Sequence, residues 1–364
     1  MIRFKHMTMA FVAAWTVTVL AVPPVKRGPI IGGAPKPVPT AKSAASAPRA
    51  KAPVAKGPVK PESKRKGPPP QTGKSAPPGA GPMAPYRGAI AVDAGTGRVL
   101  FADHADRSAF PASVTKLMTF LLVLEDLKAG RYALTDQVAG SVYSASMEPS
   151  KVDLQPGQTM SVEDLLFALM IKSANDGAAA LAEHAAWIES GGKGPVPPAA
   201  KSRELVQAFV ARMNRRAKEL GMTASRYESP NGLPPGLKEA RGFDTSTATD
   251  LAKLCRRIVA IEGALRYTAV ASRTVKGGNG QPLGLSTHNY FLPGSHDKDG
   301  LAHPILGCDG LKTGYTAASG SSIALTAARN GRRVIVVVLG SAGRHEREAA
   351  AGRILRDAIE AIAW

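Results

Sequence analysis

The stretch FPASVTKLMTFLLVLEDL, residues 110–127, carries a loop into a strongly apolar helical run. Pro111 suits the first turn of a helix, and Gly130 is placed to end it. Ser113 and Lys116 stand three residues apart at the start of this helix. Side chains at that spacing share one face of a helix, so we expect the hydroxyl and the amine to hydrogen-bond.

We expect the lysine of this pair to be neutral rather than charged. Phe110 and Leu117 are apolar neighbours, and desolvation beside them lowers the pKa of the Lys116 amine toward the uncharged form. A serine next to a neutral amine is an activated nucleophile. The pattern therefore predicts that Ser113 attacks a carbonyl carbon while Lys116 takes its proton.

The Ser-x-x-Lys motif is weak evidence when it stands alone. It recurs at Ser63, Ser190 and Ser295, each in polar or Gly/Pro-rich surroundings. For an isolated match, a helix cap followed by a solvated lysine is the better interpretation. Only the copy at Ser113 opens an apolar helix, so the remainder of a catalytic site must be found elsewhere in the chain.

The first 22 residues are arranged like an export signal. Arg3 and Lys5 precede an uncharged, mostly apolar run over residues 7–22, and residues 19–21 fit a cleavage site. An uncleaved membrane anchor is the alternative, although the run is shorter than the roughly 20 residues that a span needs. The sequence therefore predicts an exported, periplasmic or otherwise extracytoplasmic protein, with residues 1–22 as signal peptide or inner-membrane anchor.

Residues 23–85 are predicted to be a disordered, basic, proline-rich linker. They hold 17 of the 29 prolines and 12 Lys or Arg against one acid, Glu62, which gives a net charge of +11. Such a segment cannot bury a core. Nucleic acid is not the expected partner, because export removes the chain from it and no aromatic residue lies among the lysines. A solvated spacer is the preferred interpretation, and contact of residues 1–85 with a membrane or an anionic cell-wall polymer is the alternative.

The two cysteines and seven histidines indicate no metal site. No His-x-x-x-His or Cys-x-x-Cys spacing is present, so neither a metal nor another cofactor is expected. A disulfide is conceivable in an exported protein. Cys255 lies in a helical pattern and Cys308 precedes an expected strand, so we predict that both are buried and unpaired.

Residues 86–364 are predicted to form one domain of the α/β (α+β) class. Two strands surround a turn at residues 94–97, and an Asn330-Gly331 turn joins two apolar runs, which is a strong hairpin signal. Between them lie helical patterns, including one that breaks within residues 172–176 and resumes to Trp187. We therefore expect an antiparallel sheet built from both ends of the chain and flanked by helices, beside a helical subdomain.

Three short motifs follow one another along the chain: Ser113-x-x-Lys116, Ser173-Ala174-Asn175 and Lys312-Thr313-Gly314. This order resembles the penicillin-recognising serine acyltransferases, and within them the D-alanyl-D-alanine carboxypeptidases, the low-molecular-weight penicillin-binding proteins. The likeness extends to the segments around each motif, over residues 89–119, 154–184 and 308–322, and covers about residues 86–364. It implies a β-lactamase/transpeptidase-like fold with a D,D-peptidase catalytic domain over those residues.

The resemblance gives each catalytic residue a role. Ser113 would form an acyl-enzyme while Lys116 takes its proton. Ser173 would relay a proton to the departing amine, and Asn175 would hold the substrate backbone. The backbone N–H groups of Ser113 and Tyr315 would stabilise the oxyanion.

The third motif is expected to bind substrate. Lys312 and Thr313 can bind a terminal carboxylate, and Gly314 lets the substrate approach a strand closely. Two positions depart from the commoner family pattern: Tyr315 stands where histidine is frequent, and His288 stands where a basic residue would help to hold a carboxylate. Because histidine is mostly uncharged at neutral pH, carboxylate binding by His288 is in doubt.

These residues favour a serine D-alanyl-D-alanine carboxypeptidase that removes the terminal D-alanine from peptidoglycan stem pentapeptides and is acylated by β-lactams. A D,D-endopeptidase acting on cross-links with the same residues is one alternative. A non-turnover sensor that binds β-lactam or cell wall is another. A β-lactamase is disfavoured, because the second motif is Ser-Ala-Asn and no Glu-x-x-Leu-Asn follows it before the third.

Overall fold

The computed structural model describes residues 85–197, 201–234, 242–300 and 302–362. The expected signal segment, and the expected linker up to residue 84, lie outside these described residues. Among the described helices, none is long and apolar enough to cross a membrane.

The centre of the domain is a five-stranded antiparallel sheet in the order β2-β1-β9-β8-β7. The first strand of the domain pairs with the last, with Ala89 opposite Val338. The predicted sheet built from both ends of the chain is therefore confirmed, as is the hairpin at Asn330-Gly331, whose two residues have the positive φ that a tight hairpin turn needs. The strands are β1 (Gly88–Asp93), β2 (Val99–Asp103), β7 (Cys308–Thr316), β8 (Gly320–Arg329) and β9 (Arg332–Ser341).

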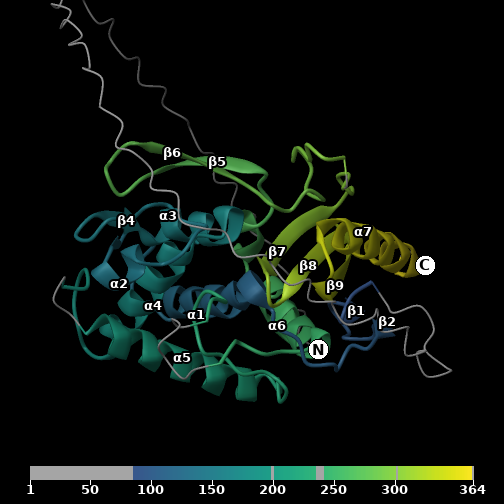
Figure 1. The fold of residues 1–364 in the computed structure, drawn as a ribbon, viewed down its shortest axis with the longest axis horizontal. Helices are drawn as coiled ribbons and strands as arrows, with labels where there is room; N and C mark the ends of the chain where they lie inside the picture. Colours follow the sequence, from purple (N-terminus) through teal and green to yellow (C-terminus); the bar gives the residue numbers. More distant parts are fainter. Residues whose placement is uncertain (1–84, 198–200, 235–241, 301, 363–364) are drawn as a thin grey trace, which may run out of the picture. The chain divides into compact units, whose positions relative to one another are not determined.

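Helices cover both faces of this sheet (Figure 1). Strand β9 shows why: Val334, Val336 and Val338 pack with α7 (Arg344–Ala361), whereas the alternate residues Ile335 and Val337 belong to the core on the opposite face. Both faces of a strand that reads as a continuous apolar run must be buried. The opposite face is covered by α6 (Ala248–Val259) and, beyond it, α1 (Lys116–Lys128).

The middle of the chain forms the helical subdomain. The predicted break is present: α3 (Val162–Phe167) continues into a π-helical turn, η2 (Ala168–Lys172), and the chain resumes as α4 (Asn175–Glu189). The sequence did not predict the two small hairpins. The remaining elements are α2 (Val142–Ala145), α5 (Ser202–Glu219), a 3-10 turn η3 (Ala264–Tyr267), and the hairpins β3 (Gln137–Ala139) with β4 (Thr159–Ser161) and β5 (Ser272–Lys276) with β6 (Pro282–Ser286).

Helix α1 is the axis of the subdomain. Ten of its 13 residues are buried, so it is surrounded by other elements on almost every side. It is preceded by a 3-10 turn, η1 (Ala112–Thr115), which begins after Pro111, and it is followed by Gly130 with φ of 67°. The predicted start and end of the helix are thus confirmed, except that its first turn is of the tighter 3-10 form.

Both cysteines are buried and unpaired, as predicted. Cys255 lies inside α6 and Cys308 opens β7. Burial raises the pKa of the Cys255 thiol, which keeps it protonated and unreactive at neutral pH.

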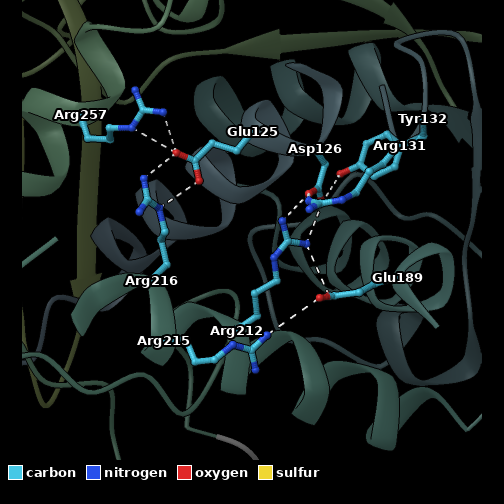
Figure 2. A network of polar contacts seen from close by, with 9 residues as sticks. All are labelled: Glu125, Asp126, Arg131, Tyr132, Glu189, Arg212, Arg215, Arg216 and Arg257. Atoms are coloured by element: carbon cyan, nitrogen blue, oxygen red, sulfur yellow. Dashed lines mark hydrogen bonds and ion pairs between the residues drawn. The ribbon is translucent and has the colours of Figure 1, made fainter. Parts of the chain in front are cut away.

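An ion-pair network ties α1 to α5 and α6 (Figure 2). Glu125 accepts hydrogen bonds from Arg216 and from Arg257. The next residue, Asp126, is fully buried and is paired with Arg212. Its carboxylate is also contacted by two residues just beyond α1, Arg131 and Tyr132.

Replacing Arg212 tests this network. The substitution Arg212→Ala leaves a buried carboxylate short of its main counter-charge, and we expect it to lower the free energy of unfolding by about 3 kcal/mol. The matched control is Arg215→Ala. That side chain is 62% exposed, and its one ion pair, with Glu189, is long at 3.9 Å. Its effect should stay under about 0.5 kcal/mol. Equal losses in urea denaturation of the two variants would contradict the assignment.

Candidate active site

The predicted serine–lysine pair forms in the structure. Ser113 lies in η1 and Lys116 is the first residue of α1, and the Lys116 Nζ is 2.9 Å from the Ser113 Oγ. Strand β7 passes close by: a Cβ on Gly314 would lie 2.8 Å from the carbonyl oxygen of Pro111 and 3.1 Å from the Ser113 nitrogen. The glycine of the third motif is therefore required by the chain's own approach to the serine.

Lys116 is completely buried and has three oxygen neighbours. Besides Ser113, its Nζ is 2.6 Å from Asn175 Oδ1 and 2.7 Å from the carbonyl oxygen of Asn231. Those two oxygens can only accept, so the two hydrogens of a neutral amine are directed to them and the nitrogen lone pair is left facing the Ser113 hydroxyl. This is the arrangement that a general base requires.

The electrostatic surroundings favour that neutral form. Burial lowers the pKa of Lys116 well below its ordinary value, and the positive charge of Lys312 lowers it further. Asp244 and Asp176 act in the opposite direction. The predicted lowering of the Lys116 pKa is confirmed. Phe110, however, is more than a third exposed and stacks on Phe243, so it is not the neighbour that buries the amine.

The second motif is held in place by the backbone of a neighbouring loop. Ser173 adopts a left-handed conformation at the end of η2, with φ of 63°, which is uncommon for a residue other than glycine. Asn175 donates from its backbone to the carbonyl of Ser150 and from its side-chain amide to the carbonyl of Glu148. With the amide nitrogen so engaged, the oxygen Oδ1 must point to Lys116.

A cavity of about 640 Å³ opens in front of these groups. Seven of the nine residues predicted for the site line it, whereas Lys116 and Lys312 lie buried behind its wall. The seven are Ser113, Ser173, Asn175, His288, Thr313, Gly314 and Tyr315. The structure therefore brings together residues that are up to 202 positions apart in the sequence, between Ser113 and Tyr315.

Basic side chains gather around one part of this cavity. Lys312 is buried, donates to the carbonyl of Thr313 at 2.9 Å, and has its pKa lowered to about 7 by burial and by Arg347. Arg347 lines the cavity from the first turns of α7, is only 5% exposed, and is bonded to its neighbour Glu348. Burial, together with Lys312, lowers the pKa of His288 to about 4, so this imidazole is neutral at neutral pH.

Sequence reasoning missed Arg347. In the sequence it is one of several charged residues of a terminal helix, where a solvated face is the ordinary interpretation. Only the packing of α7 against the sheet reveals that its guanidinium is buried at the cavity. Within the described residues, no group of three or more His, Cys, Asp or Glu is placed to hold a metal ion.

Comparison with known proteins identifies the family of this chain. The family model described as D-alanyl-D-alanine carboxypeptidase matches residues 82–343. The chain belongs to that family. Its fold is also shared: the penicillin-binding protein PBP3 of Streptococcus pneumoniae, described as a peptidoglycan synthesis regulatory factor, superimposes with a TM-score of 0.62 at 28% identity, covering 77% of this chain and 72% of that one.

Two curated relatives of this carboxypeptidase family span the same domain. DacF of Bacillus subtilis is 29% identical over 269 residues, which is 74% of this chain and 61% of the relative. DacC of Escherichia coli is 32% identical over 273 residues, or 71% of this chain and 58% of the relative. Both are named D-alanyl-D-alanine carboxypeptidase. The chain thus matches about three-fifths of the length of these two relatives.

Asp244 is a second residue that sequence reasoning missed, and it supports Lys116 indirectly. Asp244 is fully buried and accepts hydrogen bonds from the Thr115 hydroxyl at 3.0 Å and from the Ser229 hydroxyl and backbone N–H, each at 2.9 Å. Those bonds fix the turn that presents the Asn231 carbonyl to Lys116. The sequence shows an Asn-Gly turn here, but the contribution of a backbone carbonyl leaves no signal in residue types. Burial raises the pKa of Asp244 to about 6.

The substitution Asp244→Asn tests its electrostatic part. An asparagine can still accept from the backbone N–H groups and donate to both hydroxyls, so the turn should persist while the negative charge is lost. Because that charge raises the pKa of Lys116, its removal should shift the rising, acidic limb of the acylation rate toward lower pH. The rate of penicillin acylation measured from pH 5 to 9 checks this. The shift is expected above about pH 6, where Asp244 is ionised, and an unmoved limb in that range would contradict it.

Proposed function

We propose that this chain is a serine D-alanyl-D-alanine carboxypeptidase that removes the terminal D-alanine from peptidoglycan stem pentapeptides and is acylated by penicillins. The observation that carries the proposal is the Lys116 Nζ, buried and shared between Ser113 Oγ at 2.9 Å and Asn175 Oδ1 at 2.6 Å. Membership of the carboxypeptidase family supports the same reaction.

The Ser113 Oγ attacks the carbonyl carbon of the penultimate D-alanine while its proton passes to Lys116. The negative charge that develops on the carbonyl oxygen is stabilised by the backbone N–H groups of Ser113 and Tyr315, which lie where β7 approaches η1. The C–N bond then breaks, and the departing amine receives a proton through the Ser173 hydroxyl. Free D-alanine leaves and an ester on Ser113 remains.

The carboxylate of the terminal D-alanine is bound at the opposite end of the cavity. The Thr313 hydroxyl and the guanidinium of Arg347 bind it, and Lys312 behind Thr313, whose pKa burial lowers to about 7, adds to the attraction in its protonated fraction. His288, being neutral, contributes a hydrogen bond and no charge. The requirement for a free carboxylate makes the enzyme a carboxypeptidase.

Water completes the cycle by attacking the ester carbonyl carbon while Lys116 takes one of its protons. The ester C–O bond then breaks, the shortened peptide leaves as a carboxylic acid, and Lys116 returns the proton to the Ser113 Oγ. A penicillin differs in one respect: its leaving nitrogen remains joined to the acyl group after the ring opens. The tethered fragment stays in the cavity and hinders the approach of water. A long-lived adduct on Ser113 is the consequence.

The three-part organisation of the chain belongs to the same proposal. Residues 1–22 direct export or anchor the chain, residues 23–85 form the basic linker, and residues 86–364 are the catalytic domain. Peptidoglycan lies outside the cytoplasmic membrane, so an extracytoplasmic location fits the substrate. Contact of residues 1–85 with a membrane or an anionic wall polymer fits their net positive charge.

Release of D-alanine from a stem pentapeptide by the full chain tests the proposal. We expect one D-alanine per peptide and one penicillin adduct on Ser113. The variant Ser113→Ala should lose both, with turnover lower by at least about 10³-fold. Ser190→Ala is the matched control, since it removes another serine of the Ser-x-x-Lys pattern that caps α4 away from the cavity.

The other outcomes of this experiment separate the alternatives. Cleavage of a cross-linked dimer without release from the pentapeptide would replace the carboxypeptidase by an endopeptidase. An adduct without turnover of either substrate would indicate a sensor. Penicillin labelling that survives in Ser113→Ala would overturn the assignment of the nucleophile.

A further inference from the structure

A second cavity, of about 800 Å³, lies beside the first at the end of the sheet. We call it the turn cavity, because the turn between β7 and β8 forms one of its walls. The other walls come from the segment before β1, the segment before η1, and the end of β9. Its lining residues are Pro85–Arg87, Arg107–Phe110, Ala317–Gly320 and Gly340–Ala342.

The turn cavity adjoins the active-site cavity. Ala342 lines both cavities, and the consecutive residues Gly320 and Ser321 line one each. The same two segments border both cavities: Ser113 and Tyr315 face the first, and Phe110 and Ala317 face the second. A substrate that extends past the reacting serine can therefore reach the turn cavity.

The direction of the substrate places its upstream half there. The terminal carboxylate is held at Thr313 and the scissile carbonyl at Ser113, so the acyl part continues past Tyr315 toward Ala317. Strand β7 is an edge strand, with a neighbour on one side only, and can align an extended peptide along its free side. At about 3.3 Å per residue, an extended peptide beside β7 advances by about two residues between Tyr315 and Ala317.

The charge of the turn cavity selects an anion. Arg87 and Arg107 line it, both exposed, and its lining residues, all within the described part of the chain, include no Asp or Glu. The Nε of Arg87 donates to the carbonyl of Ser108, which fixes the guanidinium at the cavity wall. Ser341 is fully buried at the cavity, and its Oγ has no hydrogen-bond partner among the described residues.

An acidic group on the substrate matches the two arginines of the turn cavity, since it is anionic and arrives along β7.

We propose that the turn cavity is a binding subsite for a carboxylate on the upstream half of the stem peptide, with Arg87 and Arg107 as its ligands. A stem peptide linked through the γ-carboxyl of a glutamyl residue carries a free α-carboxylate two residues before the acylating D-alanine. That group is the expected ligand, and amidating it removes the charge. This inference rests on the proposed function, because it takes the direction of the substrate from the carboxypeptidase reaction.

The test compares three substrates of the full chain: a pentapeptide with the free γ-glutamyl α-carboxylate and lysine at the third position, the same peptide amidated at that carboxylate, and an acetylated tripeptide ending in D-Ala-D-Ala. We expect the acidic pentapeptide to have the highest kcat/KM. In Arg107→Ala and in Arg87→Ala, its ratio to the amidated pentapeptide should fall about ten-fold. Arg98→Ala is the matched control, an exposed arginine in the β1–β2 turn at the other end of β1, and should keep the ratio.

Binding separates this inference from the proposed reaction. Calorimetry with the Ser113→Ala chain measures the affinity for the acidic and amidated pentapeptides without turnover. A preference for the acid that is lost in Arg107→Ala supports the subsite even if the unsubstituted chain releases no D-alanine. Equal affinity for the two peptides, or a preference that both arginine variants retain, would overturn the subsite.

Discussion

Burial of one amine governs the rest of this structure. Lys116 is fully enclosed, and an ammonium ion in that position would lose several kcal/mol of hydration free energy. Its nitrogen is instead surrounded by three oxygens, from Ser113, Asn175 and Asn231, each within 2.9 Å. Each of those oxygens comes from a different segment, so the chemistry of the amine depends on the packing of all three.

The core supplies the rigidity that this arrangement needs. Helix α1 begins at Lys116 and is buried on almost every side. Its far end is tied to α5 by the buried pair of Asp126 with Arg212, and to α5 and α6 by the ion pairs of Glu125 (Figure 2). A shift of α1 would break these contacts together with those of Lys116. The position of Lys116 is thus fixed by the same packing that stabilises the subdomain.

Charges in the cavity follow from burial in the same way. Lys116, Lys312 and His288 all have a lowered pKa, with burial as the largest cause, and each is also near another cation. Arg347 and the protonated fraction of Lys312 attract a carboxylate, and the charge of Lys312 also lowers the pKa of Lys116. In the proposed reaction, the same charges would serve both substrate binding and proton transfer.

Parts of this organisation are legible in the sequence because they are local. The hydrogen bond between Ser113 and Lys116 follows from helical spacing, and the hairpin follows from the two residues Asn330 and Gly331 that tolerate positive φ. The small hairpins β3–β4 and β5–β6 could not be predicted in the same way. Their strands are only three to five residues long, too short for a clear alternating pattern.

By itself, the sequence determined the class of fold and the order of the three motifs, and it predicted Ser113 and Lys116 as nucleophile and base, because residue types at fixed spacing carry that information. Only the tertiary structure decided how Asp244 supports the turn at Asn231, how Gly314 admits the chain beside Ser113, and that Arg347 is buried at the cavity. Those contributions depend on backbone atoms and on packing between segments far apart in the chain. Neither leaves a pattern in the residues themselves.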